Sequence, residues 1–312
     1  MKILVTGALG HIGSHLIREL PFHFPGANIV MIDNMMTQRY ASLFNLPAAG
    51  RYTFHDADVS TMNLQELIDA QTVVVHLAAI TDAAGSFGNA EAVERNNFTS
   101  TQAVARACAT SGARLITLSS TSVYGTQAAL VSEAATEDEL KPQSPYARTK
   151  LKEEQCVRDL HLTQGLRSVT FRFGTIFGAS IGMRYHTAVN KFCWQAVMGQ
   201  PATVWSTAYH QKRPYLSLQD ASRAICHFIS NEIFDGEVYN VLTSNLTVSD
   251  ILDAIRLHVP GLTTTFADSP IMNQLSYEVD RSKIAAVGFE PVGSLVHDIG
   301  QTISLLRNSN GA

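Results

Sequence analysis

The amino-acid sequence predicts an α/β fold, in which helices cover both faces of a doubly wound parallel sheet and a smaller α/β lobe follows toward the C-terminus. Short continuous apolar runs, of which residues 3–5 are the first, are typical of strands buried on both faces. These runs alternate with helical patterns of apolar residues as far as residue 173, as parallel βαβ units do. With 312 residues, 46% of them hydrophobic, the chain can bury a sizeable core.

The first predicted strand leads into a glycine-rich turn that opens a helix. Gly7 allows the tight turn, Gly10 lets the backbone approach a pyrophosphate, and Gly13 lets the helix pack closely against the strand. The amides at the helix N-terminus, among them those of His11 and Ile12, would then face the phosphates. Glycine turns also follow strands in proteins that bind no nucleotide, so this motif alone only favours a dinucleotide site.

A carboxylate ends the second predicted strand, which covers residues 29–32. Asp33 can bind both hydroxyls of an adenosine ribose and would repel a 2′-phosphate. The sequence therefore predicts NAD rather than NADP, with Asn34 in the same site; a solvated loop Asp is the alternative. Asp58 and Val59, which follow the third strand, are expected beside the adenine ring.

Small or apolar residues after the strand predicted at 72–76 would let the backbone lie along the cofactor. These residues are Leu77, Ala78 and Ala79. The next helical pattern, at 90–111, contains Asn97, whose polar side chain needs partners if it is buried. Asn97 is expected to steady the central strands or to contact the cofactor; a plain position on the helix surface is the alternative.

A Tyr and a Lys four residues apart, Tyr146 and Lys150, would lie on one face of a helix, one turn from each other. A phenol has an unperturbed pKa of about 10, and a nearby ammonium favours the phenolate and lowers that pKa. Tyr146 could then exchange a proton with a substrate hydroxyl. Ser120 follows the strand predicted at 114–118, at the sheet edge where such folds bind ligands, and could hold the substrate oxygen. An ordinary helix start and a strand-end turn are the alternatives.

Taken in order, these motifs resemble the extended short-chain dehydrogenases/reductases, in their nucleotide-sugar epimerase/dehydratase branch. The matching stretches are TGALGHIG (Thr6–Gly13), Asp33, Asp58-Val59, HLAA (His76–Ala79), Asn97, SSTSVYG (Ser119–Gly125), SPYARTK (Ser144–Lys150) and RFGTIFG (Arg172–Gly178). The resemblance implies a Rossmann-type NAD-binding domain over residues 1–173. It implies a mainly substrate-binding lobe over 174–312, from which the segment around 213–240 returns to the first domain. Asp220 is expected to cap the helix at 221–230.

The resemblance also assigns roles to the motifs. Ser120, Tyr146 and Lys150 would form the catalytic set. Tyr146 and Lys150 would also contact NAD, with Lys150 holding the nicotinamide ribose. Relatives are usually homodimers through two long helices, which correspond here to residues 90–111 and 145–164.

A site for a nucleotide-diphosphate sugar is implied as well. Its expected residues are Thr121, Ser122, Thr175, Arg184, Trp205 and Arg213. Trp205 would cover the nucleotide base, and Arg213 would bind the diphosphate, which suits a planar bidentate donor. Thr175 stands where many relatives have Asn. Arg184 could meet an anionic substrate or belong to a solvated basic face.

The expected activity is NAD-dependent epimerisation of a nucleotide sugar, at C4 through a transient 4-keto intermediate. Dehydratases of this branch usually carry Asp-Glu directly after the catalytic Ser or Thr, but this chain has Thr121 and Ser122 there. Asp82 could bring a carboxylate from another loop, so a dehydratase, or an NAD(P)-dependent reductase or dehydrogenase, is the alternative. A non-catalytic dinucleotide-sensing protein is less favoured, because such proteins commonly lose the Tyr or the Lys.

Charge and composition disfavour several other classes. A net charge of −4 without a basic run gives no electrostatic support for nucleic-acid binding. No apolar stretch reaches the roughly 18 residues of a membrane span. The four cysteines lack metal-ligand spacing and indicate reduced thiols in a cytoplasmic protein, with no metal site.

Overall fold

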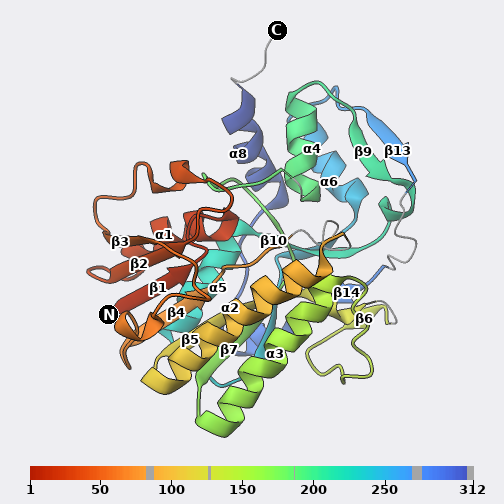
Figure 1. Ribbon diagram of the computed structural model, residues 1–312. Helices are drawn as coiled ribbons and strands as arrows, with labels where there is room; N and C mark the ends of the chain where they lie inside the picture. Colours follow the sequence, from red (N-terminus) through yellow and green to blue (C-terminus); the bar gives the residue numbers. More distant parts are fainter. Residues whose placement is uncertain (82–87, 126–127, 186, 269–275, 308–312) are drawn as a thin grey trace.

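The computed structural model describes residues 1–81, 88–125, 128–185, 187–268 and 276–307. Its centre is a seven-stranded parallel sheet in the order β11-β7-β5-β4-β1-β2-β3 (Figure 1). The strands are β1 (Lys2–Thr6), β2 (Asn28–Asp33), β3 (Arg51–Asp56), β4 (Thr72–His76), β5 (Arg114–Ser120), β7 (Arg167–Phe173) and β11 (Val238–Val241). The strand order reverses between β1 and β4, which is where open α/β sheets bind ligands. The predicted doubly wound sheet is therefore confirmed.

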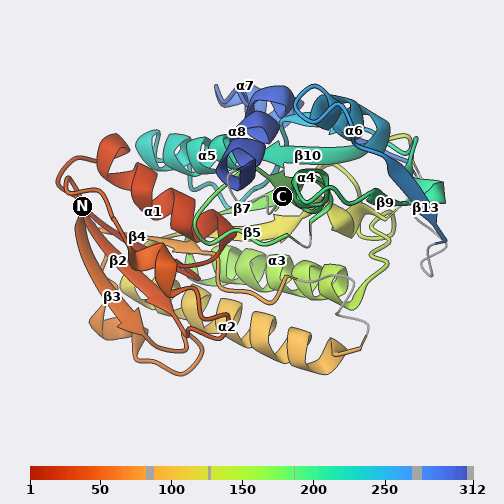
Figure 2. The ribbon, with the colours of Figure 1, turned by 90° about the horizontal axis from the view of Figure 1, so that it is seen from above.

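Helices cover both faces of this sheet (Figure 2). On one face, α2 (Ala90–Ser111) and α3 (Pro145–Gln164) lie side by side. On the other face lie α1 (His11–His23) and α5 (Leu218–Ser230), which also pack against each other.

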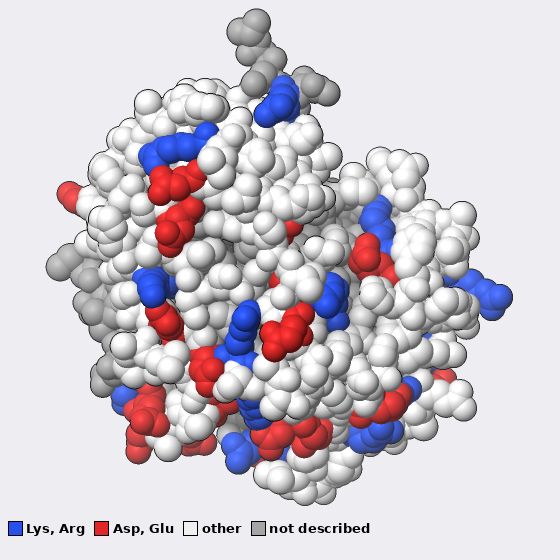
Figure 3. All heavy atoms as spheres, turned by 180° about the vertical axis from the view of Figure 1, so that it is seen from behind, with Lys and Arg blue, Asp and Glu red and all other residues white. Residues whose placement is uncertain are grey.

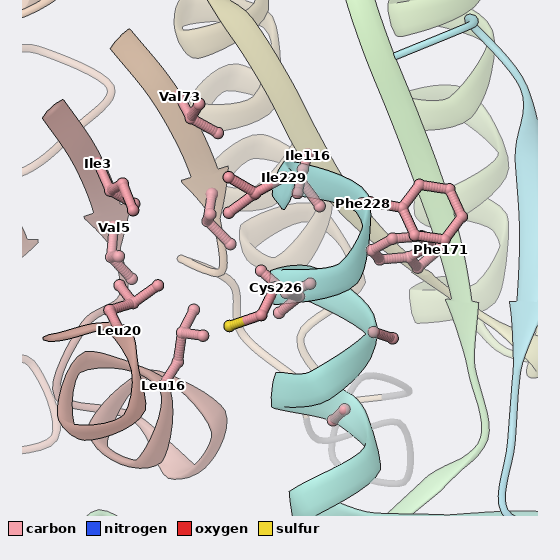
Figure 4. Packing of buried hydrophobic residues seen from close by; sticks show 14 of the residues in the cluster. Ile3, Val5, Leu16, Leu20, Val73, Ile116, Phe171, Cys226, Phe228 and Ile229 are labelled. Atoms are coloured by element: carbon pink, nitrogen blue, oxygen red, sulfur yellow. The ribbon is translucent and has the colours of Figure 1, made fainter. Parts of the chain in front are cut away.

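The strands are buried on both faces, so their alternate residues enter different cores. Ile3 and Val5 of β1 belong to the core that α1 and α5 cover, whereas Leu4 belongs to the core under α2 and α3. Figure 4 shows the first of these cores, in which Leu20 of α1 and Ile229 of α5 point toward the strands. This double burial explains why the strands appear in the sequence as continuous apolar runs.

The C-terminal lobe combines helices with short strands. Its helices α4 (Ala188–Val197), α6 (Val248–Arg256) and α8 (Leu295–Arg307) share one apolar core with β9 (Ala202–Trp205), and β13 (Thr264–Ala267) pairs with β9 in parallel. Beside the main sheet lies a three-stranded sheet of β8 (Thr175–Phe177), β10 (Arg213–Ser217) and β12 (Ser244–Leu246). Within the residues that the structure describes, the other two strands are the pair β6 (Leu130–Val131) and β14 (Glu278–Val279), and the other α-helix is the short α7 (Ser282–Ala286). The chain returns to the main sheet through α5 and β11.

Helix α5 begins earlier than the sequence suggests. Its N-cap is Ser217, and Asp220 lies in the first turn of the helix. Asp220 is fully buried, and its carboxylate accepts hydrogen bonds from Thr243 Oγ1 at 2.7 Å, Val292 N at 2.8 Å and Gly293 N at 2.9 Å. The prediction of Asp220 as N-cap is wrong, because this carboxylate ties α5 to two distant segments instead of to its own backbone.

Side chains of both charges lie on the surface of the protein. On the face shown in Figure 3, basic and acidic side chains lie close to one another in small groups among many uncharged side chains. Among the residues described, no helix is long and apolar enough to cross a membrane. In the same part of the chain, no three His, Cys, Asp or Glu side chains are grouped so that they could hold a metal ion.

Candidate active site

A pocket opens beside the ends of β1, β2 and β4, and most of the predicted cofactor residues line it. They are Gly7, Gly10, His11, Ile12, Gly13, Asp33, Asn34, Asp58, Val59, Leu77, Ala78 and Ala79. The pocket thus collects residues that follow β3 as well as β1, β2 and β4, from four separate strand ends. Asn97, Tyr146 and Lys150, which are also predicted to serve the cofactor, do not line this pocket.

The glycine-rich turn requires glycine for steric reasons. Gly7 has a φ of +64°, and a Cβ there would lie 2.7 Å from the backbone nitrogen of Ala78. A Cβ at Gly13 would lie 2.4 Å from the carbonyl oxygen of Gly7. No side chain therefore fits at Gly7 or Gly13, and the backbone N–H groups where α1 begins are available to a pyrophosphate.

The two predicted acidic residues of the pocket are held by local hydrogen bonds. The carboxylate of Asp33 accepts from Leu9 N and from Met35 N, both at 3.1 Å. Asp58 Oδ1 accepts from the hydroxyl of Ser60 at 2.6 Å and from its backbone N–H at 2.9 Å, and these bonds lower the pKa of Asp58. A fixed carboxylate at the end of β2 and a bare glycine turn together fit NAD.

Several pocket residues are absent from the sequence prediction. They are Ile32, Met36, Thr37, Arg39, Ala57, Ile80, Thr81, Asn96 and Ser100. Arg184, which is expected to meet the substrate, also lines this pocket, and its guanidinium donates to the hydroxyl of Thr81. Burial lowers the pKa of Arg39, and the nearby charge of Arg184 lowers it further. Two guanidinium groups in one pocket suit the two phosphates of a dinucleotide.

Arg184 reaches the pocket because the segment that carries it packs on the glycine-rich turn. Ser180 Oγ donates a hydrogen bond to the carbonyl oxygen of His11 at 2.9 Å. A Cβ at Gly182 would lie 2.2 Å from the carbonyl oxygen of Leu9, so the contact depends on glycine. A loop from the C-terminal half therefore completes the cofactor pocket.

His11 links this loop to the turn through its imidazole ring. Its Nε2 lies 2.8 Å from the carbonyl oxygen of Gly178. Burial lowers the pKa of His11 from 6.5 to about 4, although the bond to Gly178 acts in the opposite direction, and the charges of Arg39 and Arg184 add to the lowering. The ring is therefore neutral near pH 7, and Nε2–H donates to the carbonyl.

The low pKa of His11 should make the protein less stable in acid. The unfolded chain binds a proton at this histidine near pH 6.5, whereas the folded protein binds it only near pH 4. The stabilisation by the neutral His11 ring is therefore complete above pH 6.5 and is lost as the pH falls toward about 4. The expected loss is up to about 3 kcal/mol. His11→Gln, whose amide can still donate to Gly178, should lose less stability over this range in denaturant titrations. His23→Gln, on an exposed residue, is the control; equal losses in wild type and His11→Gln would contradict the assignment.

Asn97 shapes the pocket from behind. It is fully buried in α2, where its side chain accepts from Ile80 N at 2.8 Å and donates to the carbonyl oxygen of Ile80 at 2.9 Å. Because Ile80 and Thr81 line the pocket, Asn97 positions the loop that follows β4. Its burial rules out the plain helix-surface position, and a direct contact with the cofactor stays a prediction.

Helix α3 places the predicted catalytic Tyr and Lys. Ser144 caps the helix by accepting a hydrogen bond from Ala147 N at 3.1 Å, and Pro145 occupies the first helical position. Tyr146 and Lys150 then lie one turn apart, with Lys150 Nζ 5.7 Å from the centre of the Tyr146 ring. The helix also packs against the turn after β5 that begins next to Ser120.

The electrostatics of Tyr146 differ from the expectation of a lowered pKa. Burial raises the pKa of Tyr146, Lys150 lowers it, and Glu153 raises it again. Arg184 is close enough to lower it as well. Burial and the Glu153 carboxylate raise the pKa of Tyr146 more than the Lys150 ammonium lowers it, so the phenol holds its proton more tightly than free tyrosine.

The turn after β5 orients the hydroxyl of Ser120. Its Oγ accepts hydrogen bonds from the Ser122 hydroxyl at 2.9 Å and from Ser122 N at 3.2 Å. Its own proton therefore stays available for a substrate oxygen. The side chain of Thr121, which is expected to contact the substrate, is buried instead and donates to the carbonyl oxygen of Phe173 at 3.3 Å.

The other predicted substrate residues lie on the short strands of the C-terminal half. Arg213, at the start of β10, stacks with its guanidinium carbon 4.8 Å from the centre of the Tyr277 ring. The Tyr277 hydroxyl donates to the carbonyl oxygen of Thr121 at 3.2 Å. Tyr277 therefore links Arg213 to the turn at 120–124, called the serine turn below. Trp205 ends β9 and Thr175 begins β8; their contacts with substrate stay predictions. Asp82 lies outside the described residues.

Comparisons with known proteins agree with this geometry. A family model described as the NAD dependent epimerase/dehydratase family matches residues 3–241. A Bacillus subtilis protein described as an uncharacterized UDP-glucose epimerase is 31% identical over 248 residues, which are 77% of this chain and 76% of that protein. An Arabidopsis thaliana trifunctional enzyme, whose name includes UDP-glucose 4,6-dehydratase, is 27% identical over 303 residues, 92% of this chain but only 44% of that protein.

A solved structure gives the same result at the level of the fold. It is UDP-glucuronic acid 4-epimerase from Bacillus cereus in complex with UDP-glucuronic acid and NAD, with a TM-score of 0.87 and 28% identity. The match covers 99% of this chain and 100% of that one. With the family model matched over most of its length, this chain belongs to the NAD dependent epimerase/dehydratase family, whose cofactor is NAD.

Proposed function

We propose that this protein is an NAD-dependent UDP-sugar 4-epimerase. The observation that carries the proposal is the arrangement of Tyr146 and Lys150 on one turn of α3, beside the turn that orients Ser120. Arg184, on the wall of the NAD pocket, is close enough to affect the pKa of Tyr146, so the phenol and the cofactor pocket are neighbours. The Bacillus cereus 4-epimerase, which shares the fold over its whole length, supports the choice of reaction.

The residues of the site divide the chemistry among them. When bound, NAD supplies a reversible oxidant for the sugar carbon. Tyr146 takes the proton of the C4 hydroxyl as the 4-keto sugar forms, and returns it after the planar carbonyl has presented its other face. Lys150 stabilises the phenolate that accepts this proton and that forms again when the proton returns to the sugar, and Ser120 donates a hydrogen bond to the substrate oxygen.

A dehydratase is the second candidate, favoured by the Arabidopsis thaliana relative. A dehydratase needs an acid and a base beside the sugar carbons next to C4. Thr121 and Ser122 do not provide them, because a hydroxyl is neither a carboxylic acid nor a carboxylate base, and both hydroxyls already donate to protein oxygens. The side chains described at this turn therefore favour epimerisation.

The substrate would bind along the C-terminal half of the chain. We infer that Arg213 binds the diphosphate, that Trp205 covers the base, and that Thr175 and Ser122 contact the sugar. Arg213 is supported by its stacking on Tyr277, which bonds to the serine turn. Arg184 is the residue that would meet a carboxylate if the sugar is a uronic acid.

The test is turnover of UDP-sugars with no free cofactor added. Purified protein loaded with NAD should convert one of UDP-glucose, UDP-N-acetylglucosamine or UDP-glucuronic acid to its C4 epimer, followed by chromatography. Turnover should continue for many cycles, since the oxidant is regenerated in each one. A strict requirement for added NAD in proportion to product would instead indicate a dehydrogenase.

Assembly and location are also proposed. We infer a homodimer through α2 and α3, because these adjacent helices form one outer face of the molecule and α3 exposes Leu162 (Figure 1). Light scattering of the purified protein would show twice the chain mass. A cytoplasmic location is inferred from the four free cysteines, which suit a reducing compartment.

A further inference from the structure

A buried carboxylate that is absent from the sequence prediction lies beside the catalytic Lys. Glu153 Oε2 is 2.8 Å from Lys150 Nζ, and the two side chains are only 6% and 5% exposed. Thr101 of α2 donates a hydrogen bond to the same oxygen at 3.0 Å. Glu153 Oε1 is also buried and has no hydrogen-bond partner in the described parts of the chain. Burying such an ion pair is costly and rarely adds stability. A role of Glu153 in the site therefore explains the pair better than a contribution to stability does.

We propose that Glu153 is a positioning residue for the proposed reaction: it neutralises Lys150 and so makes Tyr146 hold its proton more tightly. The reason is the net charge of the group formed by Lys150, Glu153 and Tyr146. With Glu153 present, the Lys150–Glu153 pair is neutral, and ionising Tyr146 adds an uncompensated buried negative charge. Without Glu153, the phenolate would instead be the counterion of Lys150, and its formation would be favoured.

The other titratable groups around Tyr146 and Lys150 do not take over the effect of Glu153 on the charge of Lys150. His76 of β4 is neutral, because burial and the charge of Lys150 lower its pKa to about 3. Glu154, the next residue on α3, is bound by the Arg172 side chain of β7 through two hydrogen bonds of 3.0 and 2.7 Å. Arg184 favours the phenolate and thus opposes Glu153.

The pKa directions agree with the geometry. Burial by itself would lower the pKa of Lys150, but Glu153 and Tyr146 raise it above its ordinary value, so the ammonium keeps its charge. The same carboxylate raises the pKa of Tyr146. A phenol that holds its proton tightly is a stronger base once it is ionised, but a weaker acid when it returns the proton to the sugar.

The experiment compares Glu153→Gln with Glu154→Gln. The first removes the charge next to Lys150 with little change of shape. The second removes the adjacent charge, whose main partner is Arg172, and serves as the matched control. Glu153→Met, which has a similar volume and no charge, is a second variant in case the amide disturbs folding. Circular dichroism would verify the fold of each protein.

The readout is the titration of Tyr146 in protein without substrate. Subtracting the phenolate absorbance of the matching Tyr146→Phe protein isolates this residue from the other eight of the nine tyrosines of the chain. We expect the midpoint in Glu153→Gln and Glu153→Met to fall by at least about one pH unit, and to move much less in Glu154→Gln. The acidic limb of the kcat/KM profile should move in the same direction.

Two results would overturn the proposal. One is an unchanged Tyr146 midpoint in both Glu153 variants, which would leave Glu153 with a purely structural role. The other is an equal shift in Glu154→Gln, which would mean that any nearby carboxylate has this effect. The inference rests on the proposed function for its meaning, but the titration needs no turnover. A wrong choice of sugar would therefore abolish the kinetic readout and leave the spectroscopic one intact.

Discussion

Replacing Tyr146 by Phe should lower turnover of the UDP-sugar by about 10²- to 10⁴-fold, because general acid–base catalysis by a positioned side chain contributes that much. The variant keeps the aromatic ring in α3 and loses only the hydroxyl that exchanges the proton. NAD should still bind, since the glycine turn and Asp33 are untouched. Steady-state conversion and NAD binding, measured on the same preparation, separate the two effects.

Tyr52→Phe is the matched control for this change. Tyr52 lies on β3, and its hydroxyl donates to the carbonyl oxygen of Ile17 at 3.1 Å, away from the proposed chemistry. Its loss should cost about 1 kcal/mol of stability and leave turnover intact. If Tyr146→Phe turned over as fast as Tyr52→Phe, Tyr146 would not be the acid–base residue.

Asp220→Ala should lower the free energy of unfolding by about 3–5 kcal/mol, because a fully buried carboxylate is removed and its hydrogen-bond donors lose their acceptor. The carboxylate accepts from Thr243, Val292 and Gly293, and Arg223 Nη1 lies 3.1 Å from it. All these donors would lose their acceptor at once. Denaturant unfolding monitored by circular dichroism gives the measurement.

Asp253→Ala removes a carboxylate from the same kind of local pair and serves as the control. Asp253 also faces an arginine three residues later, Arg256 at 2.7 Å, but its side chain is 67% exposed. A pair of this kind contributes only about 0.3–0.5 kcal/mol. Similar losses in the two variants would show that burial of Asp220 and its backbone donors add nothing.

The parts of the site that the sequence predicts well depend on short-range signals. Gly13 must lack a side chain because a Cβ there would meet the backbone of Gly7 and Ala8 in the same turn, and this need is visible in the spacing of the glycines. Asp33 ends a strand, so its side chain reaches the sheet edge whatever the rest of the chain does. Ser144 and Pro145 begin α3 through contacts within four residues. Structure that depends on residues close in the sequence can be predicted from the sequence alone.

The parts that the sequence misses depend on contacts between distant segments. Arg184 lines the NAD pocket only because the loop around Gly182 packs on the glycine turn, about 170 residues earlier. Arg39 lines the pocket because of the path of the loop after β2, and the sequence of this loop has no regular hydrophobic pattern that predicts that path. Glu153 looks like an ordinary charge on an exposed helix until Thr101 of α2 is seen to cover it. Hydrophobic periodicity carries no information about such pairings.

The most direct test of the central claim uses a UDP-sugar that carries deuterium at C4. The protein loaded with NAD, with no free cofactor added, is allowed to reach equilibrium, and the product is analysed by NMR. The expected result is the C4 epimer with deuterium still at C4, because the carbon that is oxidised is also the carbon that is reduced again. Deuterium at C6 of a deoxy sugar, as a 4,6-dehydratase would give, or deuterium released with reduced cofactor, would contradict the account.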